Sequence, residues 1–207
     1  MAFIDAQDRQ RIEAAIRDAE AKTSGEFVTV VARASDAYLT LPTLYASGLA
    51  LMAPLVLSLL RVETRALPLL LIQVAVFVTL ALLFLWTPVT MRLVPHGAKV
   101  HRAARLAREQ FFLRGLHETA DRHGVLLFVS VAERYVEIIA DKGIHARVPD
   151  DAWITVIARF SEPVRAGRTA EGFLAAIETA GELLMRHMPA PAGNPNRLSD
   201  VLVEIRG

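Results

Sequence analysis

The sequence contains no cysteine among its 207 residues. This absence excludes disulfide-stapled scaffolds, thiolate metal sites and cysteine nucleophiles. Aromatic residues make up only 7% and the net charge is +1 at pH 7, so the composition predicts no broad basic surface and no nucleic-acid partner. Residues 1–36 are charged and the first long apolar run begins too late for a secretory signal peptide, which argues against one.

Charge is missing from two long stretches of the chain. Residues 37–60 and 66–91 contain no Asp, Glu, Lys or Arg, and the mean hydropathy of the whole chain is positive, at +0.35. All 23 Lys and Arg and all 22 Asp and Glu therefore lie in the remainder, whose composition is that of a soluble domain. The sequence thus predicts an apolar part and a soluble part.

Both uncharged stretches are long enough to cross a membrane as helices. A span needs about 20 apolar residues, and residues 43–60 and 66–91 supply them. The five residues between them allow only a turn, so the spans form a hairpin and both chain termini lie on one side. A pair of buried helices in a soluble core is the alternative, but this chain offers too little surface to cover them.

The distribution of Lys and Arg around the hairpin predicts its orientation. Arg61 and Arg65 lie in the turn, whereas eight basic residues flank the spans on the terminal side: Arg17, Lys22, Arg33, Arg92, Lys99, Arg102, Arg105 and Arg108. Because basic residues near spans remain in the cytoplasm, both termini are predicted to be cytoplasmic.

The soluble residues show strand and helix patterns on both sides of the hairpin. Residues 26–33 alternate with apolar side chains on both faces, which predicts a central strand. Residues 124–132 and 135–140 predict two further strands joined as a β-hairpin. Residues 1–36 and 92–188 are therefore expected to form one α/β domain, a small sheet with flanking helices interrupted by the transmembrane hairpin at 37–91, with a linker and C-terminal tail at 189–207.

A long amphipathic helix is predicted over residues 98–122, directly after the second span. On this helix His101, Arg105 and Arg108 follow each other at helical spacing and form a basic stripe. The stripe is explained either by exposure to solvent or by contact with the anionic headgroups of a lipid bilayer.

No motif in the sequence defines a catalytic or metal site. His117 and His123 are six residues apart, a spacing that puts them on different faces of a helix, and we expect both at the surface. Asp141, Asp150 and Asp151 are the metal-ligand candidates, because oxygen ligands for Ca²⁺ or Mg²⁺ can converge from separate loops. Roles in turns and helix caps explain the same three residues, and no cofactor is expected.

Three soluble segments resemble the TPM domain family, whose members include thylakoid lumen proteins of photosystem maintenance. They are Thr23-Ser-Gly-Glu-Phe-Val-Thr-Val-Val-Ala32, the segment from His123 to Ile139, and Val164-Arg-Ala-Gly-Arg-Thr-Ala-Glu-Gly-Phe173. Arg134 and Gly143 match the family's pattern. The resemblance implies a small α/β sandwich. With its internal spans and without a signal peptide, the chain resembles the bacterial membrane-protein branch of the family. This resemblance implies a location in the bacterial inner membrane.

The resemblance leaves two functions open. Some relatives are credited with acid phosphatase activity and calcium binding, and others act as accessory proteins of membrane complexes. The leading interpretation is a membrane-anchored cytoplasmic domain that is not an enzyme and acts as an accessory or binding protein of a membrane component. The alternative is a metal-assisted phosphatase that uses the carboxylates above.

Overall fold

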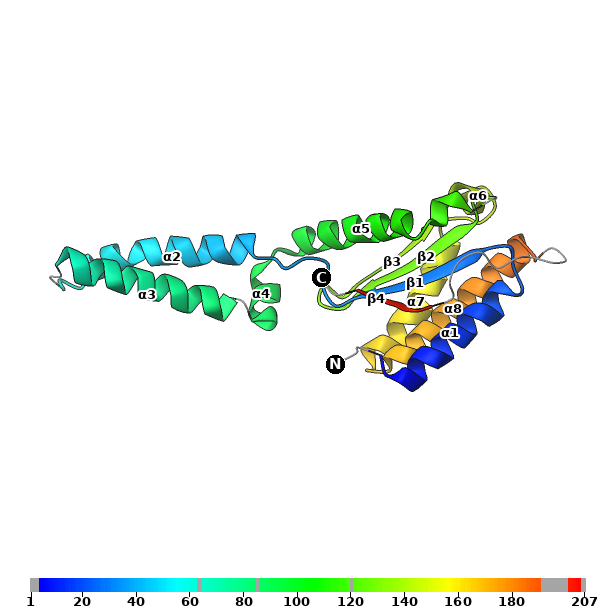
Figure 1. Ribbon diagram of the computed structural model, residues 1–207, viewed down its shortest axis with the longest axis horizontal. Coiled ribbons are helices and arrows are strands. Elements are labelled where there is room, and N and C mark those ends of the chain that lie inside the picture. Colours follow the sequence, from blue (N-terminus) through cyan, green and yellow to red (C-terminus); the bar gives the residue numbers. More distant parts are fainter. Residues whose placement is uncertain (1–3, 63–64, 85, 120, 191–200, 206–207) are drawn as a thin grey trace. The chain divides into compact units, whose positions relative to one another are not determined.

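The computed structural model describes residues 4–62, 65–84, 86–119, 121–190 and 201–205 (Figure 1). The chain divides into two compact units. The first unit combines Met1–Ser35 with Arg102–Gly207, and the second unit is Asp36–His101. The first unit is thus built from two segments that are far apart in the sequence.

The first unit contains a four-stranded sheet with the order β3-β2-β1-β4. The strands are β1 (Glu26–Ala32), β2 (Gly124–Ser130), β3 (Tyr135–Ala140) and β4 (Val203–Ile205). Strands β1 and β2 run parallel in the centre, β3 is antiparallel to β2, and β4 is parallel to β1 at the opposite edge. All seven residues of β1 are buried, which confirms the prediction of a central strand with two apolar faces.

The register of the central pair fixes which residues meet at its end. Glu26 aligns with Gly124 and Ala32 aligns with Ser130, so the carboxyl ends of β1 and β2 lie side by side. The C-terminal tail contributes β4, which a side chain of the first helix holds in place. Arg9 donates to the carbonyl oxygen of Leu202 at 2.6 Å and pairs with Glu204 at 2.5 Å.

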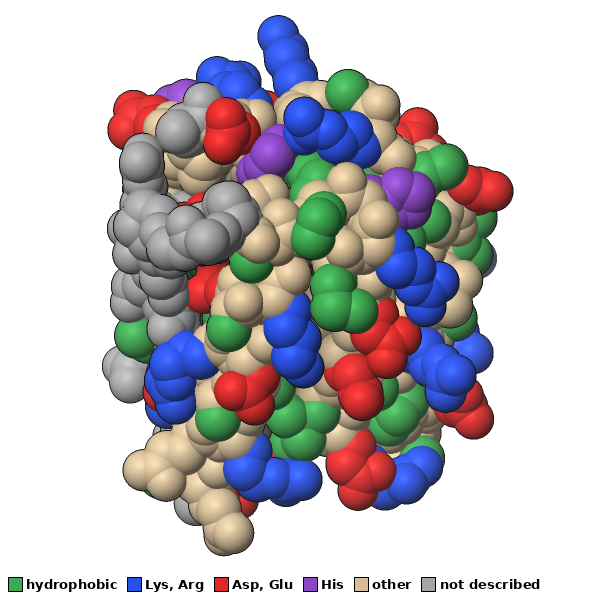
Figure 2. All heavy atoms as spheres, turned by 90° about the vertical axis from the view of Figure 1, so that its right-hand side faces the viewer, with side chains coloured by type: hydrophobic (Ala, Val, Ile, Leu, Met, Phe, Trp, Pro, Cys, Tyr) green, Lys and Arg blue, Asp and Glu red, His purple; other side chains and the backbone are tan. Residues whose placement is uncertain are grey.

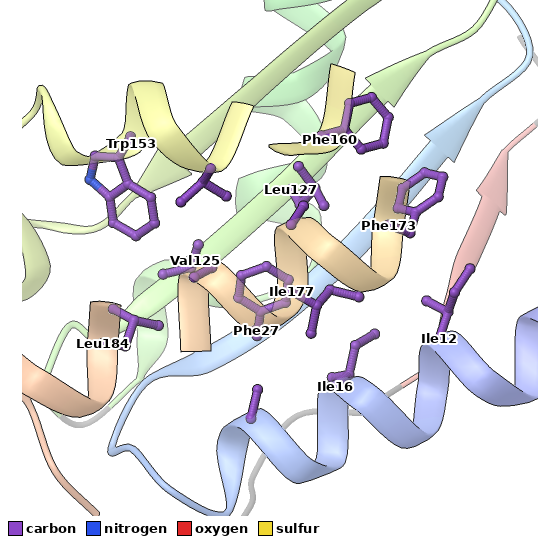
Figure 3. Close-up of a cluster of buried hydrophobic side chains, with 14 of the residues drawn as sticks. Ile12, Ile16, Phe27, Val125, Leu127, Trp153, Phe160, Phe173, Ile177 and Leu184 are labelled. Carbon is purple, nitrogen blue, oxygen red and sulfur yellow. The ribbon is translucent and has the colours of Figure 1, made fainter. Parts of the chain in front are cut away.

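Three helices cover one face of the sheet: α1 (Ala6–Glu20), α7 (Ala152–Arg165) and α8 (Thr169–His187). Their apolar faces meet the inward side chains of β1 and β2 in the larger core (Figure 3). The rings of Phe160 on α7 and Phe173 on α8 meet edge to face, 5.0 Å apart. Ile12 and Ile16 on α1 are fully buried. The helix begins where Asp5 caps it by accepting from the amide of Asp8 at 2.7 Å.

Helix α5 (His96–Leu113) covers the other face of the sheet with small side chains. Ala103 and Ala107 are fully buried there, against Phe128 of β2 among others. The helix predicted over residues 98–122 is too long, because α5 ends at Leu113. Gly115, with a φ of +69°, follows the end of α5, and the 3₁₀ helix η1 (Leu116–Glu118) comes before β2.

The end of the first unit near the short helix α6 (Lys142–His145) has a mixed surface. Side chains of Lys and Arg and of Asp and Glu are interspersed there with apolar ones, and neither sign forms a continuous patch among the described atoms (Figure 2). This distribution is typical of a solvated protein surface.

The second unit contains α2 (Thr40–Leu59), α3 (Ala66–Phe84) and α4 (Thr87–Leu93), and α2 and α3 contact each other as a hairpin. Both α2 and α3 are long and apolar enough to cross a membrane. The predicted second span over residues 66–91 contains two helices, because α3 ends at Phe84 and α4 begins at Thr87, next to Pro88. Pro is favoured in the first turn of a helix because it has no amide hydrogen to satisfy.

Candidate functional site

A buried polar network lies at the carboxyl ends of β1 and β2. The carboxylate of Glu133, in the turn after β2, accepts from the amide of Ser35 at 2.8 Å and from the hydroxyl of Ser130. The hydroxyl of Ser35 in turn donates to that of Ser130 at 2.8 Å. Glu133 is 8% exposed and Ser130 is fully buried. These bonds fix the β2–β3 turn against the end of β1 and occupy the Ser130 hydroxyl.

A pocket of about 600 Å³ lies beside this turn, against the turn between α7 and α8. Its size falls in the range of small-molecule sites. Its wall combines apolar and polar side chains: Val129, Ser130, Val131, Arg134, Tyr135, Val136, Phe160, Ser161, Val164, Arg165 and Thr169. The described lining thus includes two guanidinium groups and several hydroxyls, and no carboxylate.

The two arginines of this pocket are free to meet a ligand. Within the described part of the chain, neither Arg134 nor Arg165 makes a side-chain hydrogen bond or an ion pair, and both are exposed. Uncompensated guanidinium groups attract oxyanions, which they bind in a fork of two parallel hydrogen bonds. The pocket is therefore suited to a negatively charged group.

Arg134 also has a backbone conformation that residues other than glycine rarely adopt, with a φ of +53°. This left-handed conformation costs roughly 1–2 kcal/mol for a residue with a Cβ. Arg122 has a similar φ of +59°, but its guanidinium pairs with the buried carboxylate of Asp141 at 2.7 Å. The guanidinium of Arg134 makes no such bond within the described residues.

Tyr135 contributes a protonated phenol to the wall of the pocket. Its hydroxyl donates to Glu137 at 2.9 Å. Burial, and then this hydrogen bond to a carboxylate, raise the pKa of Tyr135 well above its usual value of 10.0. The phenol is therefore neutral at every physiological pH and adds no negative charge that would oppose an anion.

His123 is buried, 6% exposed, so the prediction that it lies at the surface is wrong. Its Nε2 faces the guanidinium of Arg147 at 2.5 Å, and its Nδ1 lies 3.1 Å from the Ser24 hydroxyl. Burial, and then the charge of Arg147, lower the pKa of His123. Because Arg147 can only donate, Nε2 accepts and Nδ1 carries the proton that Ser24 accepts. In this tautomer His123 cannot take a proton from Ser24, so the pair is a structural bond.

The three aspartates predicted as metal ligands do not converge. Asp141 is 5% exposed, caps α6 by accepting from the amide of Lys142 at 2.8 Å, and pairs with Arg122. Asp150 is exposed and lies 3.1 Å from His145, and Asp151 is exposed at the start of α7. Within the described ranges no group of three His, Asp or Glu side chains could hold a metal ion. A metal-binding role for these three aspartates stays a prediction.

Gly143 has a packing reason for matching the family's pattern. A Cβ at this position would come within 2.7 Å of the His123 ring and still closer to the Asp121 carbonyl oxygen. The backbone of α6 can therefore approach the segment before β2 only with glycine here.

The basic residues predicted to contact lipid are all exposed on α5. His101, Arg105 and Arg108 point away from the buried Ala103 and Ala107 of the same helix. The helical spacing in the sequence therefore predicts the two faces of α5 correctly. Contact of this basic face with anionic lipid headgroups stays a prediction.

Fold and pocket together define a small α/β domain with a mixed sheet between two helical layers. Residues 89–183 match the family model described as TPM domain. The chain is also similar to the BA42 protein of the psychrophilic bacterium Bizionia argentinensis, whose NMR structure it matches with a TM-score of 0.62 at 20% identity, over 98% of this chain and 96% of that chain. The match over residues 89–183 confirms the family resemblance for that part of the chain, and the similar structure confirms the fold class. The comparison with curated proteins returned no match.

The family match and the sequence resemblance overlap only in part. The match begins after α3, so the resemblance at residues 23–32 lies outside it. The pocket around Arg134 and Arg165 was not predicted, because two separate parts of the sequence form its lining. One is the turn after β2, and the other, about 30 residues further along the chain, is the end of α7 with the start of α8. The match of Arg134 to the family's pattern was the one available signal.

Proposed function

We propose that this protein is anchored in the bacterial inner membrane by the α2–α3 hairpin, with both termini in the cytoplasm, and that its TPM domain acts there as a non-catalytic accessory protein of a membrane component. The observation that carries the anchoring is the exposure of the apolar helices. In the most apolar 18-residue segment of each helix, only 17% of α2 and 6% of α3 is buried. Large apolar side chains such as Leu59, Leu67 and Leu82 are more than 60% exposed.

Water is a poor solvent for such a surface. Leaving one large aliphatic side chain exposed instead of buried costs about 1.5–3 kcal/mol. A bilayer removes this cost, because its hydrocarbon layer of about 30 Å matches the length of a 20-residue helix. Arg61 and Arg65 lie at the turn of the hairpin, and the eight basic residues near its other end favour cytoplasmic termini.

The exposed basic face of α5 supports the same location. His101, Arg105 and Arg108 follow the hairpin closely in the chain, and each Lys or Arg near an anionic leaflet contributes about 1 kcal/mol to binding.

A reporter enzyme that works only in the periplasm, fused after Gly207, should remain inactive, whereas the same reporter inserted between Arg61 and Arg65 should be active. Activity after Gly207 would overturn the proposed orientation.

The accessory role is supported by how the described titratable side chains are used. Asp141 is bound to Arg122, His123 to Arg147, and Glu133 to two serines. General acid–base chemistry needs a positioned group whose proton can move within hydrogen-bond reach of substrate.

If the protein acts as an accessory protein, purification of the full chain in a mild detergent should retain a defined membrane component in a fixed ratio. A chain that purifies alone and turns over a substrate would contradict this role.

A metal-assisted, acid-type phosphatase is the second candidate, because the matching family model carries phosphatase in its name and the pocket is basic. The test is turnover of a phosphomonoester by the full chain with Mg²⁺, Ca²⁺ or Mn²⁺, at acid and neutral pH. Asp141→Asn removes a buried carboxylate, and a double variant, Asp150→Asn with Asp151→Asn, removes two exposed ones. Turnover that both variants lose while still folding favours the phosphatase, and equal background rates favour the accessory role.

A further inference from the structure

We propose that the groove between α1 and α8 binds a basic amphipathic helix that belongs to the membrane component. The inference rests on the proposed function, in which the sheet-containing unit assists such a component, and it names the chemistry of the segment that the component presents. The groove is separate from the pocket beside the β2–β3 turn, because the described linings of the two share no residue.

The floor of the groove is apolar because α1 and α8 lie side by side and approach each other closely (Figure 1). A Cβ on Gly181 would lie 2.8 Å from that of Ala19, so glycine permits this contact. Ala15, Leu174 and Met185 complete the apolar lining of a groove of about 470 Å³. Met185 is 41% exposed, and a docking helix would remove this apolar side chain from water.

The rims of the groove are acidic. Its described lining contains three carboxylates, of Asp18, Glu178 and Glu182, and the ammonium group of Lys22. Asp18 and Glu178 are exposed and make no side-chain hydrogen bond or ion pair with the described part of the chain. Glu182 pairs with the exposed Arg186 at 3.5 Å, a surface contact that adds little to stability. The negative charge of the rims is therefore left for a partner.

Charge complementarity selects the occupant. An apolar floor between acidic rims matches a helix with apolar side chains on one face and Lys or Arg on its flanks, and binding of a helix in a groove is a common mode of recognition. Cytoplasmic segments next to membrane spans carry an excess of Lys and Arg. A unit held at the cytoplasmic face of the membrane, as proposed, therefore meets segments of this chemistry on other membrane proteins.

The test is calorimetric titration of the full chain, purified in a maltoside detergent, with a designed peptide of about 18 residues, which is long enough to form a helix in solution. The peptide has Leu and Ala on one face and Lys on the other. The same peptide with Glu in place of Lys is the charge control. A shuffled peptide of identical composition, which has no apolar face, is the pattern control. The heat that each peptide gives with empty micelles is subtracted.

The Lys peptide should bind at least tenfold more tightly than either control peptide. Its affinity should fall as the salt concentration rises, because ions screen the exposed charges of the rims. Equal affinity of the Lys peptide and either control, or no binding of the Lys peptide, would overturn the inference.

Variants assign the binding to the groove. Asp18→Asn combined with Glu178→Gln should weaken binding of the Lys peptide at least tenfold, and Met185→Gln should weaken it at least threefold. All three side chains are exposed, so the melting temperature should not change. Asp151→Asn combined with Glu162→Gln is the matched control, since it removes two exposed carboxylates that do not line the groove. Unchanged affinity in the first double variant, or an equal loss in the control, would overturn the assignment.

A photoreactive amino acid in place of Met185 tests the source of the helix in bacterial membranes. A cross-link to a cytoplasmic segment of a membrane protein that is rich in Lys and Arg supports the inference. A cross-link to an acidic segment, or to a second copy of this chain, would overturn the inference and leave the accessory role in place. A chain that binds the Lys peptide but retains no membrane component during purification would contradict the accessory role and leave the groove site in place.

Discussion

The sheet domain and the helical hairpin contain the same apolar residue types but differ in how these are covered. Phe128 and Phe173 in the sheet domain are 0% exposed, whereas Leu71 and Leu59 in the hairpin are 59% and 75% exposed. The first unit therefore gains its stability from contacts within its own chain. The second unit has a surface that only an apolar surrounding stabilises. Apolar composition is thus not evidence of a core until the structure shows what covers it.

The largest expected effect concerns the assembly of the sheet domain from two segments. Replacing residues 37–91 with a short Gly/Ser linker should leave a soluble, folded protein, because the first unit has its own core. Removing residues 1–34 from that variant as well deletes α1 and the central strand β1, and it should unfold. Circular dichroism melting measures both outcomes. An equally cooperative melt after the second deletion would show that the domain does not depend on its N-terminal segment.

A smaller effect compares one buried with one exposed apolar side chain. Phe173→Ala removes a ring that packs against Phe160 in the larger core, and it should lower the free energy of unfolding by about 3–5 kcal/mol. Leu71→Ala in α3 should change the unfolding of the sheet domain by less than about 0.5 kcal/mol. Denaturant titration of the full chain in detergent checks both values. Similar losses in the two variants would break the contrast between the units.

The smallest effect is a pH dependence confined to the sheet domain. The pKa of His123 lies below the usual histidine value of 6.5, so the folded state favours the neutral ring. This ring faces Arg147 and Ser24 and is influenced by the charge of Asp121. Its contribution to stability is complete above pH 6.5, where both states are neutral. It is lost as the pH falls from 6.5 through the folded pKa, because the unfolded state then binds the proton first.

His123→Gln is the control for this pH dependence, because its amide offers a donor and an acceptor without titrating. The stability of the variant should change less between pH 7 and pH 5 than that of the unmodified chain, as measured by denaturant titration at each pH. An identical dependence in both proteins would show that other groups are responsible.

Periodicity and composition predicted the fold well because they report on burial. The alternation over residues 26–33 predicted a strand covered on both faces. The helical spacing of His101, Arg105 and Arg108 predicted an exposed face of α5. Helix ends were less predictable. Gly115 stops α5 by its left-handed φ, and α3 stops at Phe84 within a continuous apolar run, where hydropathy has no signal.

The candidate site was hardly predictable, since it depends on side chains that only the tertiary structure brings together. His123 was expected at the surface near the end of a helix. Its neighbours Arg147 and Ser24, distant in sequence, supply the bonds that permit its burial. In the same way, nothing in the local sequence of Arg165 relates it to Arg134. For Asp141 the sequence left a metal role and a cap role open, and the structure shows that it caps α6 and pairs with Arg122.

The most direct test of the contrast between the two units is alkaline carbonate extraction of bacterial membranes that contain the full chain. Carbonate at high pH releases proteins held by charge or by protein contacts and leaves spanning proteins in the lipid. We predict that the full chain remains in the pellet, because the proposed anchor places the exposed faces of α2 and α3 in the bilayer. The variant with residues 37–91 replaced by a linker should be found in the supernatant. Release of the full chain into the supernatant would contradict the membrane anchor.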